Sequence, residues 1–197
     1  MKLVLASKNQ KKLAEMNEIL SGLGVEVCSE AEAGVALEVE ETGTTFEENS
    51  LLKARAVMEA SGLPAIADDS GLCVDALGGA PGVYSARYGG EGLDDPGRTR
   101  LLLENMRGQT PRTCRFVSVI TCCFPNGDVL SARGECEGTV AYAPVGENGF
   151  GYDPVFFVPE LKKTFAQLSP QEKNARSHRG RALEAFQVKL EEYLKNR

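Results

Sequence analysis

The first third of the chain shows two hydrophobic patterns in succession. Leu3–Ser7 is a short apolar run, which predicts a buried strand. Between Asn9 and Leu20 the apolar residues recur every three or four positions, which predicts an amphipathic helix. Residues 25–28, Val-Glu-Val-Cys, then predict a second short strand after a glycine-rich turn.

A second strand and helix pair follows an acidic loop. Thr45 and Glu48 have the spacing of a capping box, so we expect a helix from there to about Ala60. Residues 64–67, Pro-Ala-Ile-Ala, predict a buried strand that ends at Asp68. Asp68 opens the segment Asp-Asp-Ser-Gly, a composition typical of turns.

The second half of the chain mixes helices with an antiparallel pattern. Asp95 before Pro96 predicts a capped helix start. Two strand-like runs, residues 112–124 and 129–140, flank an Asn-Gly turn and predict a hairpin. We expect a further strand over residues 150–159, and one last helix over residues 169–194.

These patterns together predict an α/β fold with a long mixed sheet flanked by helices. Strands alternate with helices at the start of the chain, and an antiparallel hairpin follows. The 197 residues suffice for one core-forming domain, or for one domain with two lobes, and no internal repeat or linker divides them. We therefore assign residues 1–197 to a single domain with two lobes.

Composition narrows the possible partners. The net charge of −6 argues against a protein that coats nucleic acid, although basic residues cluster at 8–12 and 173–181. No apolar run is long enough for a membrane helix, and the start of the chain lacks the pattern of a secretory signal. The six cysteines form no metal-binding motif and fit reduced core residues. We expect a cytoplasmic protein.

The segment Ser7–Lys12 could bind phosphate. It leads from a strand into a helix start, where free backbone N–H groups attract anions, and its lysines add charge. It lacks the glycine pattern of a P-loop, which disfavours a kinase or GTPase of that class. The alternative is an ordinary capped helix with solvated lysines.

Two pairs of adjacent acids suggest a metal site. Glu40 and Glu41 lie in one loop, and Asp68 and Asp69 lie at the expected end of a strand. Carboxylate oxygens without histidine or thiolate suit Mg²⁺, which bridges readily to substrate phosphates. The alternative is a solvated turn.

The last third of the chain carries groups suited to a nucleobase. Phe150 lies between two glycines and could stack on a base, while Asp153 could accept a hydrogen bond from it. In the expected last helix, Asn174, His178 and Arg181 share one face, near Lys173 and Arg179. The alternatives are a core aromatic and a structural histidine. Together, these signals fit a nucleoside triphosphate with Mg²⁺.

Five segments, in order along nearly the whole chain, resemble the motifs of the Ham1/RdgB family of inosine and xanthosine triphosphate pyrophosphatases. They are SKNQKKLAE, EETGTTFEENSLLKAR, ADDSGLCVDALGGAPGVYSARY, GFGYDPVFFVP and EKNARSHRG. The resemblance implies a homodimer, a central cleft between two lobes, and Mg²⁺-dependent hydrolysis of ITP, dITP and XTP to the monophosphate and pyrophosphate. The implied role is to remove deaminated purines from the nucleotide pool.

The resemblance also implies roles for individual residues. Glu41 and Asp69 would bind Mg²⁺, with Asp69 as general base and with Asp68 and Glu40 as second choices. Lys53, one helical turn after Asn49, would face the phosphates. The residues that would bind substrate are Ser7, Lys8, Asn9, Gln10, Lys11, Lys12, Ser70, Phe150, Gly151, Tyr152, Asp153, Lys173, His178 and Arg179. Our hypothesis is that Arg179 and His178 read the 6-oxo edge of the base.

Two alternatives remain open at this point. A Maf-like pyrophosphatase would hydrolyse pyrimidine or modified nucleotides, and a substrate panel distinguishes it. A nucleotide-binding protein without turnover would bind ITP but release no pyrophosphate. In every case we expect small-molecule nucleotides as partners, with no nucleic acid polymer and no membrane.

Overall fold

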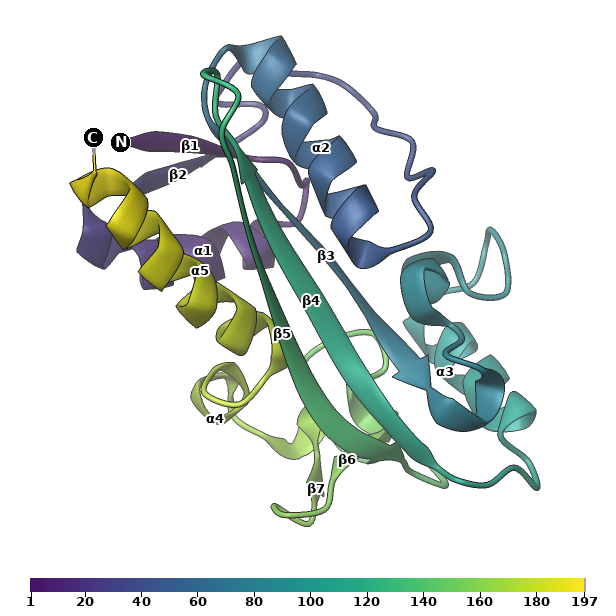
Figure 1. Ribbon diagram of the computed structural model, residues 1–197. Coiled ribbons are helices and arrows are strands. Elements are labelled where there is room, and N and C mark those ends of the chain that lie inside the picture. The colour runs from purple at the N-terminus through teal and green to yellow at the C-terminus, as the bar shows by residue number, and fades with distance from the viewer. Residues whose placement is uncertain (197) are drawn as a thin grey trace. The chain divides into compact units, whose positions relative to one another are not determined.

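The computed structural model describes residues 1–196, except for the side chain of Lys11 (Figure 1). The strands are β1 (Lys2–Leu5), β2 (Glu26–Ser29), β3 (Ala65–Val74), β4 (Thr113–Cys123), β5 (Val129–Val140), β6 (Phe156–Val158) and β7 (Lys163–Thr164). The helices are α1 (Gln10–Leu20), α2 (Phe46–Ser61), α3 (Asp95–Asn105), α4 (Pro170–Asn174) and α5 (His178–Lys195).

The strands of residues 1–196 form one mixed sheet, as the sequence predicts. Its order is β2-β1-β3-β4-β5-β6-β7. β1 is parallel to β2 and β3, whereas β6 is antiparallel to β5 and β7. The parallel pairs require crossover connections, and α1 and α2 supply them. This confirms the predicted α/β class.

The chain divides into two compact units. Unit 1 comprises residues 1–69, 118–134 and 181–197, and unit 2 comprises residues 70–117 and 135–180. The strands β3, β4 and β5 each contribute residues to both units.

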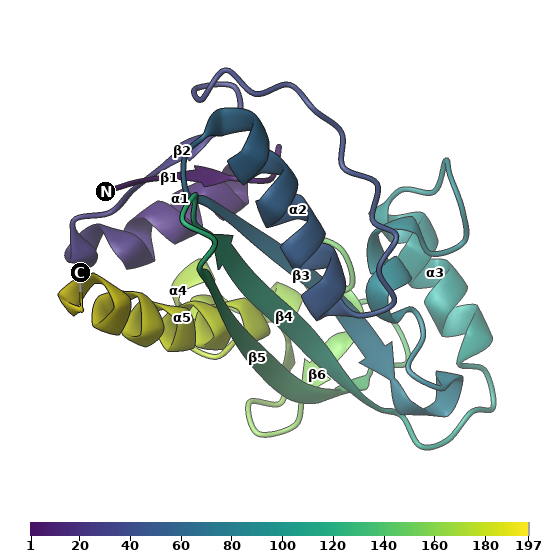
Figure 2. The same cartoon turned by 45° about the horizontal axis from the view of Figure 1, so that its top comes forward.

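In unit 1, helices cover both faces of the sheet (Figure 2). Leu3, Leu5 and Ile66 pack in a core with residues of α1 and α5. Val4 and Ala67 point to the opposite face and pack with residues of α2. This alternation follows from the two-residue period of a strand. It also determines which helix each of the two aspartates of β3 faces.

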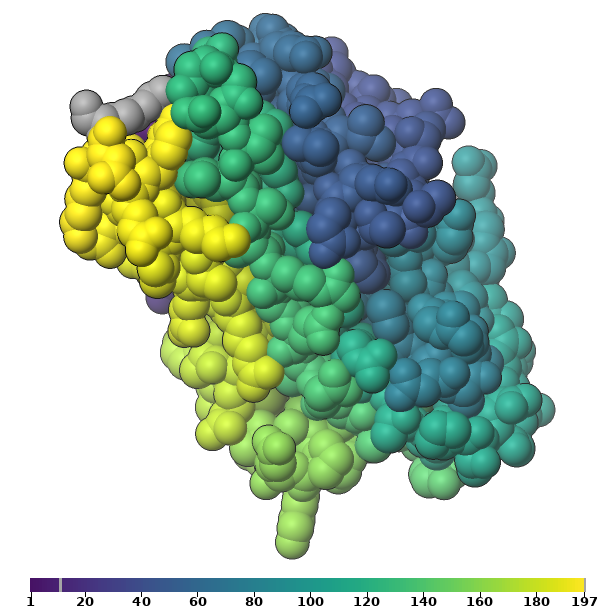
Figure 3. Space-filling model, viewed as in Figure 1, coloured from purple at the N-terminus to yellow at the C-terminus, as the bar shows by residue number. Residues whose placement is uncertain are grey.

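The outer faces of α2 and α5 flank the β4–β5 hairpin of unit 1 (Figure 3). Arg133 of the hairpin forms an ion pair of 2.7 Å with Glu47 of α2. Lys189 of α5 donates to the backbone oxygen of Ser131, across 2.5 Å. The hairpin itself confirms the prediction from the Asn-Gly turn.

The core of unit 2 is aromatic. The ring centroid of Phe156 lies 4.5 Å from that of Phe116 and 4.6 Å from that of Phe165. Tyr152 and Leu102 are buried in the same cluster. Burial of several large rings gives this unit a core of its own.

The prediction that a strand ends at Asp68 is wrong, because β3 continues to Val74. Asp-Asp-Ser-Gly favours a turn by composition. Here, however, both aspartates are buried and paired with lysines, so they stay in the extended strand. The tertiary partners outweigh the local preference.

The prediction of a single last helix is also wrong. Ser169 caps α4 as expected, but α4 ends at Asn174 and α5 begins at His178. Ser177 Oγ accepts a hydrogen bond from the backbone N–H of Gly180, across 3.0 Å, and so acts as a new cap. Asn174, His178 and Arg181 therefore do not share one face of one helix.

The start of α3 and the extent of the strand predicted over residues 150–159 also differ from expectation. The cap of α3 is Asp94, whose carboxylate accepts from the N–H of Gly97 across 2.8 Å, and Asp95 is the first helical residue. In the region predicted as a strand over residues 150–159, only Phe156–Val158 is a strand, because Asp153–Val155 forms a 3₁₀ turn.

Candidate active site

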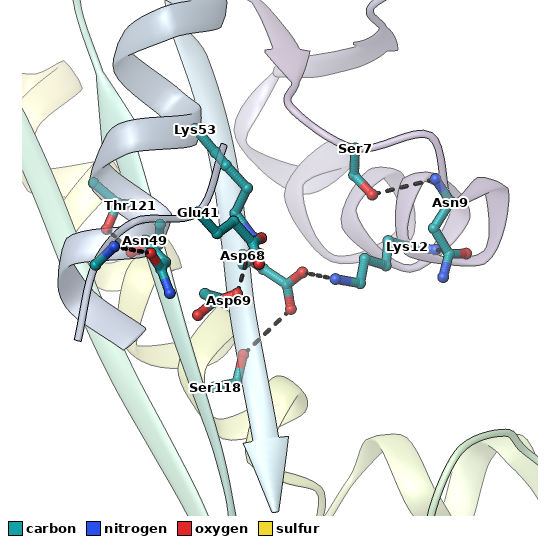
Figure 4. Close-up of polar contacts among 12 residues, drawn as sticks. Ser7, Asn9, Lys12, Glu41, Asn49, Lys53, Asp68, Asp69, Ser118 and Thr121 are labelled. Atoms are coloured by element: carbon teal, nitrogen blue, oxygen red, sulfur yellow. Dashed lines mark hydrogen bonds and ion pairs between the residues drawn. The ribbon is translucent and has the colours of Figure 1, made fainter. Parts of the chain in front are cut away.

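Asp68 forms a buried ion pair with Lys12 in unit 1 (Figure 4). Its side chain is fully buried, Lys12 of α1 donates to Oδ1, and Ser118 of β4 donates to Oδ2 across 3.5 Å. Lys12 was predicted to bind phosphate. In the structure its ammonium group is instead paired with Asp68. Ser118 was not predicted, because nothing in a strand sequence shows which residue lies across from it.

Asp69 lies on the other face of β3, toward α2. Its Oδ1 accepts from Lys53 Nζ across 2.9 Å, and the same ammonium group donates to Glu41 Oε1 across 2.7 Å. Lys53 Nζ also donates to the backbone oxygen of Asp68 across 3.0 Å. The predicted trio of Glu41, Lys53 and Asp69 is thus brought together, with the lysine between the two carboxylates.

One oxygen of Asp69 remains unsatisfied. Asp69 Oδ2 is buried and has no hydrogen-bond partner among the described residues. A buried carboxylate oxygen without a partner is costly, and a catalytic role or a bound water or ion is among the explanations for such a group. This oxygen is therefore available to a water molecule, a metal ion or a substrate.

The environment shifts the pKa of both members of the pair. Burial raises the pKa of Asp69, and the charges of Glu41 and Asp68 add to this, while Lys53 acts to lower it. Burial acts to lower the pKa of Lys53, but the charges of Asp69 and Glu41 outweigh it, so the pKa of Lys53 lies above its ordinary value. The result is a lysine that is protonated at neutral pH beside a carboxylate with raised proton affinity, which suits a general base.

The loop that carries Glu41 is anchored by Asn49. Asn49 of α2 is fully buried, and its Oδ1 accepts from the N–H of Gly43 across 2.8 Å. A side chain at Gly43 would collide with Asn49, so the glycine allows this close approach. Asn49 had no predicted role, although a polar amide among the core positions of a helix was a detectable signal.

The predicted phosphate segment is only partly assembled. Ser7, Lys8 and Lys53 line a cavity of about 310 Å³ in unit 1, together with Glu30 and Glu38. Ser7 Oγ accepts from the N–H of Asn9 across 3.2 Å, and Asn9 Oδ1 accepts from that of Lys12 across 3.4 Å, so the segment also caps α1. Asn9 and Gln10 are exposed, and the side chain of Lys11 lies outside the described residues.

Glu41 and Asp69 fit a Mg²⁺ site by the chemistry of their donors. Both offer hard carboxylate oxygens, and one of these, Asp69 Oδ2, has no partner among the described residues. Mg²⁺ commonly binds through one or two carboxylates plus substrate phosphates. Within the described part of the chain, no group of three His, Cys, Asp or Glu side chains is arranged to hold a metal, so substrate oxygens would have to complete the shell. The second choice, Glu40, has an exposed side chain.

In unit 2, Phe150 and Asp153 come together with Lys173. The ammonium group of Lys173 lies 4.8 Å from the centroid of the Phe150 ring and donates to Asp153 Oδ2 across 2.6 Å. The same oxygen of Asp153 accepts from the N–H of Phe150 across 3.0 Å. Phe150 remains 39% exposed, so part of its side chain is accessible to a flat partner.

His178 and Arg179 lie at the start of α5 and are buried. The His178 ring stacks on Phe116, with centroids 4.6 Å apart. The guanidinium group of Arg179 lies 5.7 Å from the Phe150 ring. Arg179 of α5 and Lys173 of α4 thus lie beside the same aromatic ring, although they belong to two different helices.

The remaining predicted residues have different surroundings. Tyr152 points into the core, where its hydroxyl donates to the backbone oxygen of Ser85 across 2.7 Å, and burial raises its pKa. Its side chain is therefore structural rather than exposed to substrate. Gly151 contributes only backbone, and Ser70 is half-buried in β3.

Comparison with known proteins gives consistent matches. The Ham1 family matches residues 3–189. A dITP/XTP pyrophosphatase of Exiguobacterium sp. is 49% identical over 195 residues, which cover 99% of this chain and 100% of the relative. The Ham1 protein of Staphylococcus aureus has a TM-score of 0.91 at 43% identity, covering 98% of this chain and 100% of that one. A HAM1 protein from Coxiella burnetii also has a TM-score of 0.91, at 45% identity, with both chains fully covered.

Proposed function

The chain belongs to the Ham1 family, and we propose that it hydrolyses the non-canonical purine nucleotides dITP, ITP and XTP. Water would cleave the bond between the α- and β-phosphates to give the nucleoside monophosphate and pyrophosphate. The observation that carries the proposal is Asp69, a buried carboxylate held at Oδ1 by Lys53 and unsatisfied at Oδ2. The activity for which the relatives are named, dITP/XTP pyrophosphatase, supports this substrate class, and a Maf-like activity is not favoured.

In unit 1, each member of the trio would have a distinct task. Asp69 would accept the proton of the attacking water through Oδ2, because its other oxygen is already engaged; Oδ2 has two lone pairs, so this task is compatible with holding a metal ion. Lys53 would orient this carboxylate and add positive charge near the phosphates. Glu41 and Asp69 would hold Mg²⁺, which when bound neutralises phosphate charge. Positioning dominates, since phosphoryl transfer asks little covalent chemistry of the protein.

In unit 2, the exposed ring of Phe150 would stack on the base. Base–aromatic stacking contributes roughly 1–3 kcal/mol and accepts any base. Selectivity therefore needs polar groups, and Arg179 and His178 are our candidates for reading the 6-oxo group. Adenine would leave such donors facing its amino group, and a buried unmatched donor costs about 1–3 kcal/mol.

The decisive experiment is to measure pyrophosphate release from dITP, ITP, XTP, GTP, ATP and CTP in parallel, with Mg²⁺ and with EDTA. We expect fast release from the first three only, and only with Mg²⁺. Release of orthophosphate would contradict the proposed bond. No release from any substrate by folded protein would favour a binding role instead.

We also propose a cytoplasmic homodimer that removes deaminated purines from the nucleotide pool. None of the six cysteines, all within the described residues, forms a disulfide, which fits a reducing compartment. Of the helices within residues 1–196, none is long and apolar enough to cross a membrane. Light scattering tests the dimer, because a monomer has half the expected mass.

A further inference from the structure

The first turn of α3 presents two neighbouring aspartates with different tasks. Asp94 caps the helix by accepting from the N–H of Gly97. Asp95, the first helical residue, is not needed as a cap. Its Oδ2 accepts instead from the backbone N–H of Gly151, across 2.8 Å, and its Oδ1 pairs with Arg98 across 3.3 Å.

The helix α3 holds Gly151 on both sides of the residue. Besides the bond from Asp95 to its N–H, the hydroxyl of Thr99 donates to its carbonyl oxygen across 3.4 Å. Thr99 is buried, one helical turn after Asp95. Gly151 itself has a φ of +60°, a conformation that glycine adopts readily. The two bonds therefore restrain a backbone unit that a glycine would otherwise leave adaptable.

The loop is incompletely packed on the side that faces α3. A cavity of about 550 Å³ lies here, lined among others by Asp95, Thr99, Phe150 and Gly151. A loop that borders a cavity lacks the close contacts that fix core segments. The hydrogen bonds from α3 are consequently the main restraint on Gly151 from this side.

We propose that Asp95 is a positioning residue for base recognition. By holding Gly151, it fixes the neighbouring ring of Phe150 beside Lys173, where the ring is presented to the base. Asp153 restrains the loop from within, through its bond to the N–H of Phe150, and Asp95 restrains it from outside. This role rests on the proposed function, since it assumes that Phe150 stacks on a base.

Three variants distinguish the positioning role of Asp95 from an effect on the stability of α3 and from an effect of its negative charge. Asp95→Ala removes the acceptor for Gly151. Asp95→Asn loses the charge and weakens the pair with Arg98, but an amide oxygen can still accept from Gly151. Asp94→Ala is the matched control, because it removes an adjacent carboxylate and weakens the helix cap without touching Gly151.

We expect Asp95→Ala to raise the KM for dITP about 10-fold with little change in kcat, because stacking on the base is shared by the ground and transition states. Asp95→Asn should stay within about 2-fold of the wild type, and Asp94→Ala should lower Tm while leaving KM unchanged. An unchanged KM in Asp95→Ala, or an equal rise in Asp94→Ala, would overturn the proposal. If Asp95→Ala does not fold, Thr99→Val provides the test, with an expected rise in KM of about 3-fold.

Amide hydrogen exchange tests the anchor without relying on activity. The N–H of Gly151 should exchange faster in Asp95→Ala than in the wild type, and at the wild-type rate in Asp94→Ala. Equal exchange in all three proteins would overturn the anchor even if the enzyme is active. If exchange changes as expected but the wild type hydrolyses no nucleotide, the proposed function fails and the role in recognition fails with it.

Discussion

Asp68 and Asp69 are neighbours in the chain, but they lie in different surroundings. Asp68 is fully buried with both oxygens hydrogen-bonded, one by Lys12 and one by Ser118. Asp69 shares Lys53 with Glu41 and keeps one buried oxygen unsatisfied. A satisfied carboxylate contributes to the fold, whereas an unsatisfied one retains the capacity to bind or accept a proton. The first should therefore govern stability and the second activity.

The largest expected effect is on catalysis. Asp69→Asn removes the proposed base but keeps its shape, and Lys53 retains its ion pair with Glu41. We expect the rate of pyrophosphate release to fall about 10²- to 10⁴-fold, the usual contribution of general base catalysis, with a thermal unfolding curve close to that of the wild type. Near wild-type turnover would remove Asp69 from this role.

Substitution of the neighbouring acid, Asp68, should instead affect stability. Asp68→Asn leaves the ammonium group of Lys12 without its buried charge partner. We expect the free energy of unfolding to fall by about 3–5 kcal/mol, since breaking a buried ion pair is strongly destabilising. Denaturant unfolding measures this. A variant as stable as the wild type would show that Asp68 is not the structural member of the two.

A smaller effect should follow from loosening the Glu41 loop. Asn49→Ala deletes the acceptor for the N–H of Gly43. If Glu41 binds Mg²⁺, the Mg²⁺ concentration for half-maximal activity should rise about 10- to 100-fold, as is typical for residues that orient metal ligands.

The adjacent residue provides a control for the loop. Ser50 is equally buried and shares a hydrogen bond of 2.7 Å with Thr121 rather than with the loop. Ser50→Ala should cost about 1 kcal/mol of stability and leave the Mg²⁺ dependence unchanged. Equal shifts in both variants would indicate a general effect of α2.

The most subtle effect is on pH dependence. A base must be ionised, so kcat/KM should fall as pH drops through the raised pKa of Asp69, above the ordinary value of 3.8. Lys53 acts to lower this pKa, so Lys53→Met should move the acidic limb to still higher pH. Since the pKa of Lys53 is itself raised, Lys53 should contribute no alkaline limb below 10.5. A pH titration of the Asp69 carboxyl group in both proteins without Mg²⁺ measures the shift, and the same midpoint in both would contradict it.

The sequence predicted the elements whose signals are local. The capping box of Thr45 and Glu48 and the β4–β5 hairpin around Asn126 and Gly127 were found where expected. The tight primed turn that Asn-Gly suggests was not, because Asn126 has no positive φ. The sequence-based prediction failed where a distant partner decides the structure. The composition of residues 68–71 indicates a turn, but Lys12 and Lys53, far away in the chain, keep both acids in the strand.

The candidate site shows the same division. Residue type drew attention to the paired acids, to Phe150 and to Lys173, whereas Lys53 and the role of Asp69 were predicted from the family resemblance. It did not reveal that Lys12 pairs with Asp68, that Tyr152 points into the core, or that Asp95 reaches Gly151. Each of these depends on which side chains the fold brings within hydrogen-bonding distance. A sequence read one residue at a time carries little information about such distances.

The alternation of side chains along β3 also limits which changes in chain length the protein can tolerate. Deleting one residue between Ala65 and Asp68 would turn every later side chain to the opposite face, so that Asp69 would point toward Lys12 and away from Lys53. The acidic loop over residues 35–44 has no regular structure and can absorb the same deletion more easily. In a library of single-residue deletions, functional members should therefore be found in the loop and be absent from the strand.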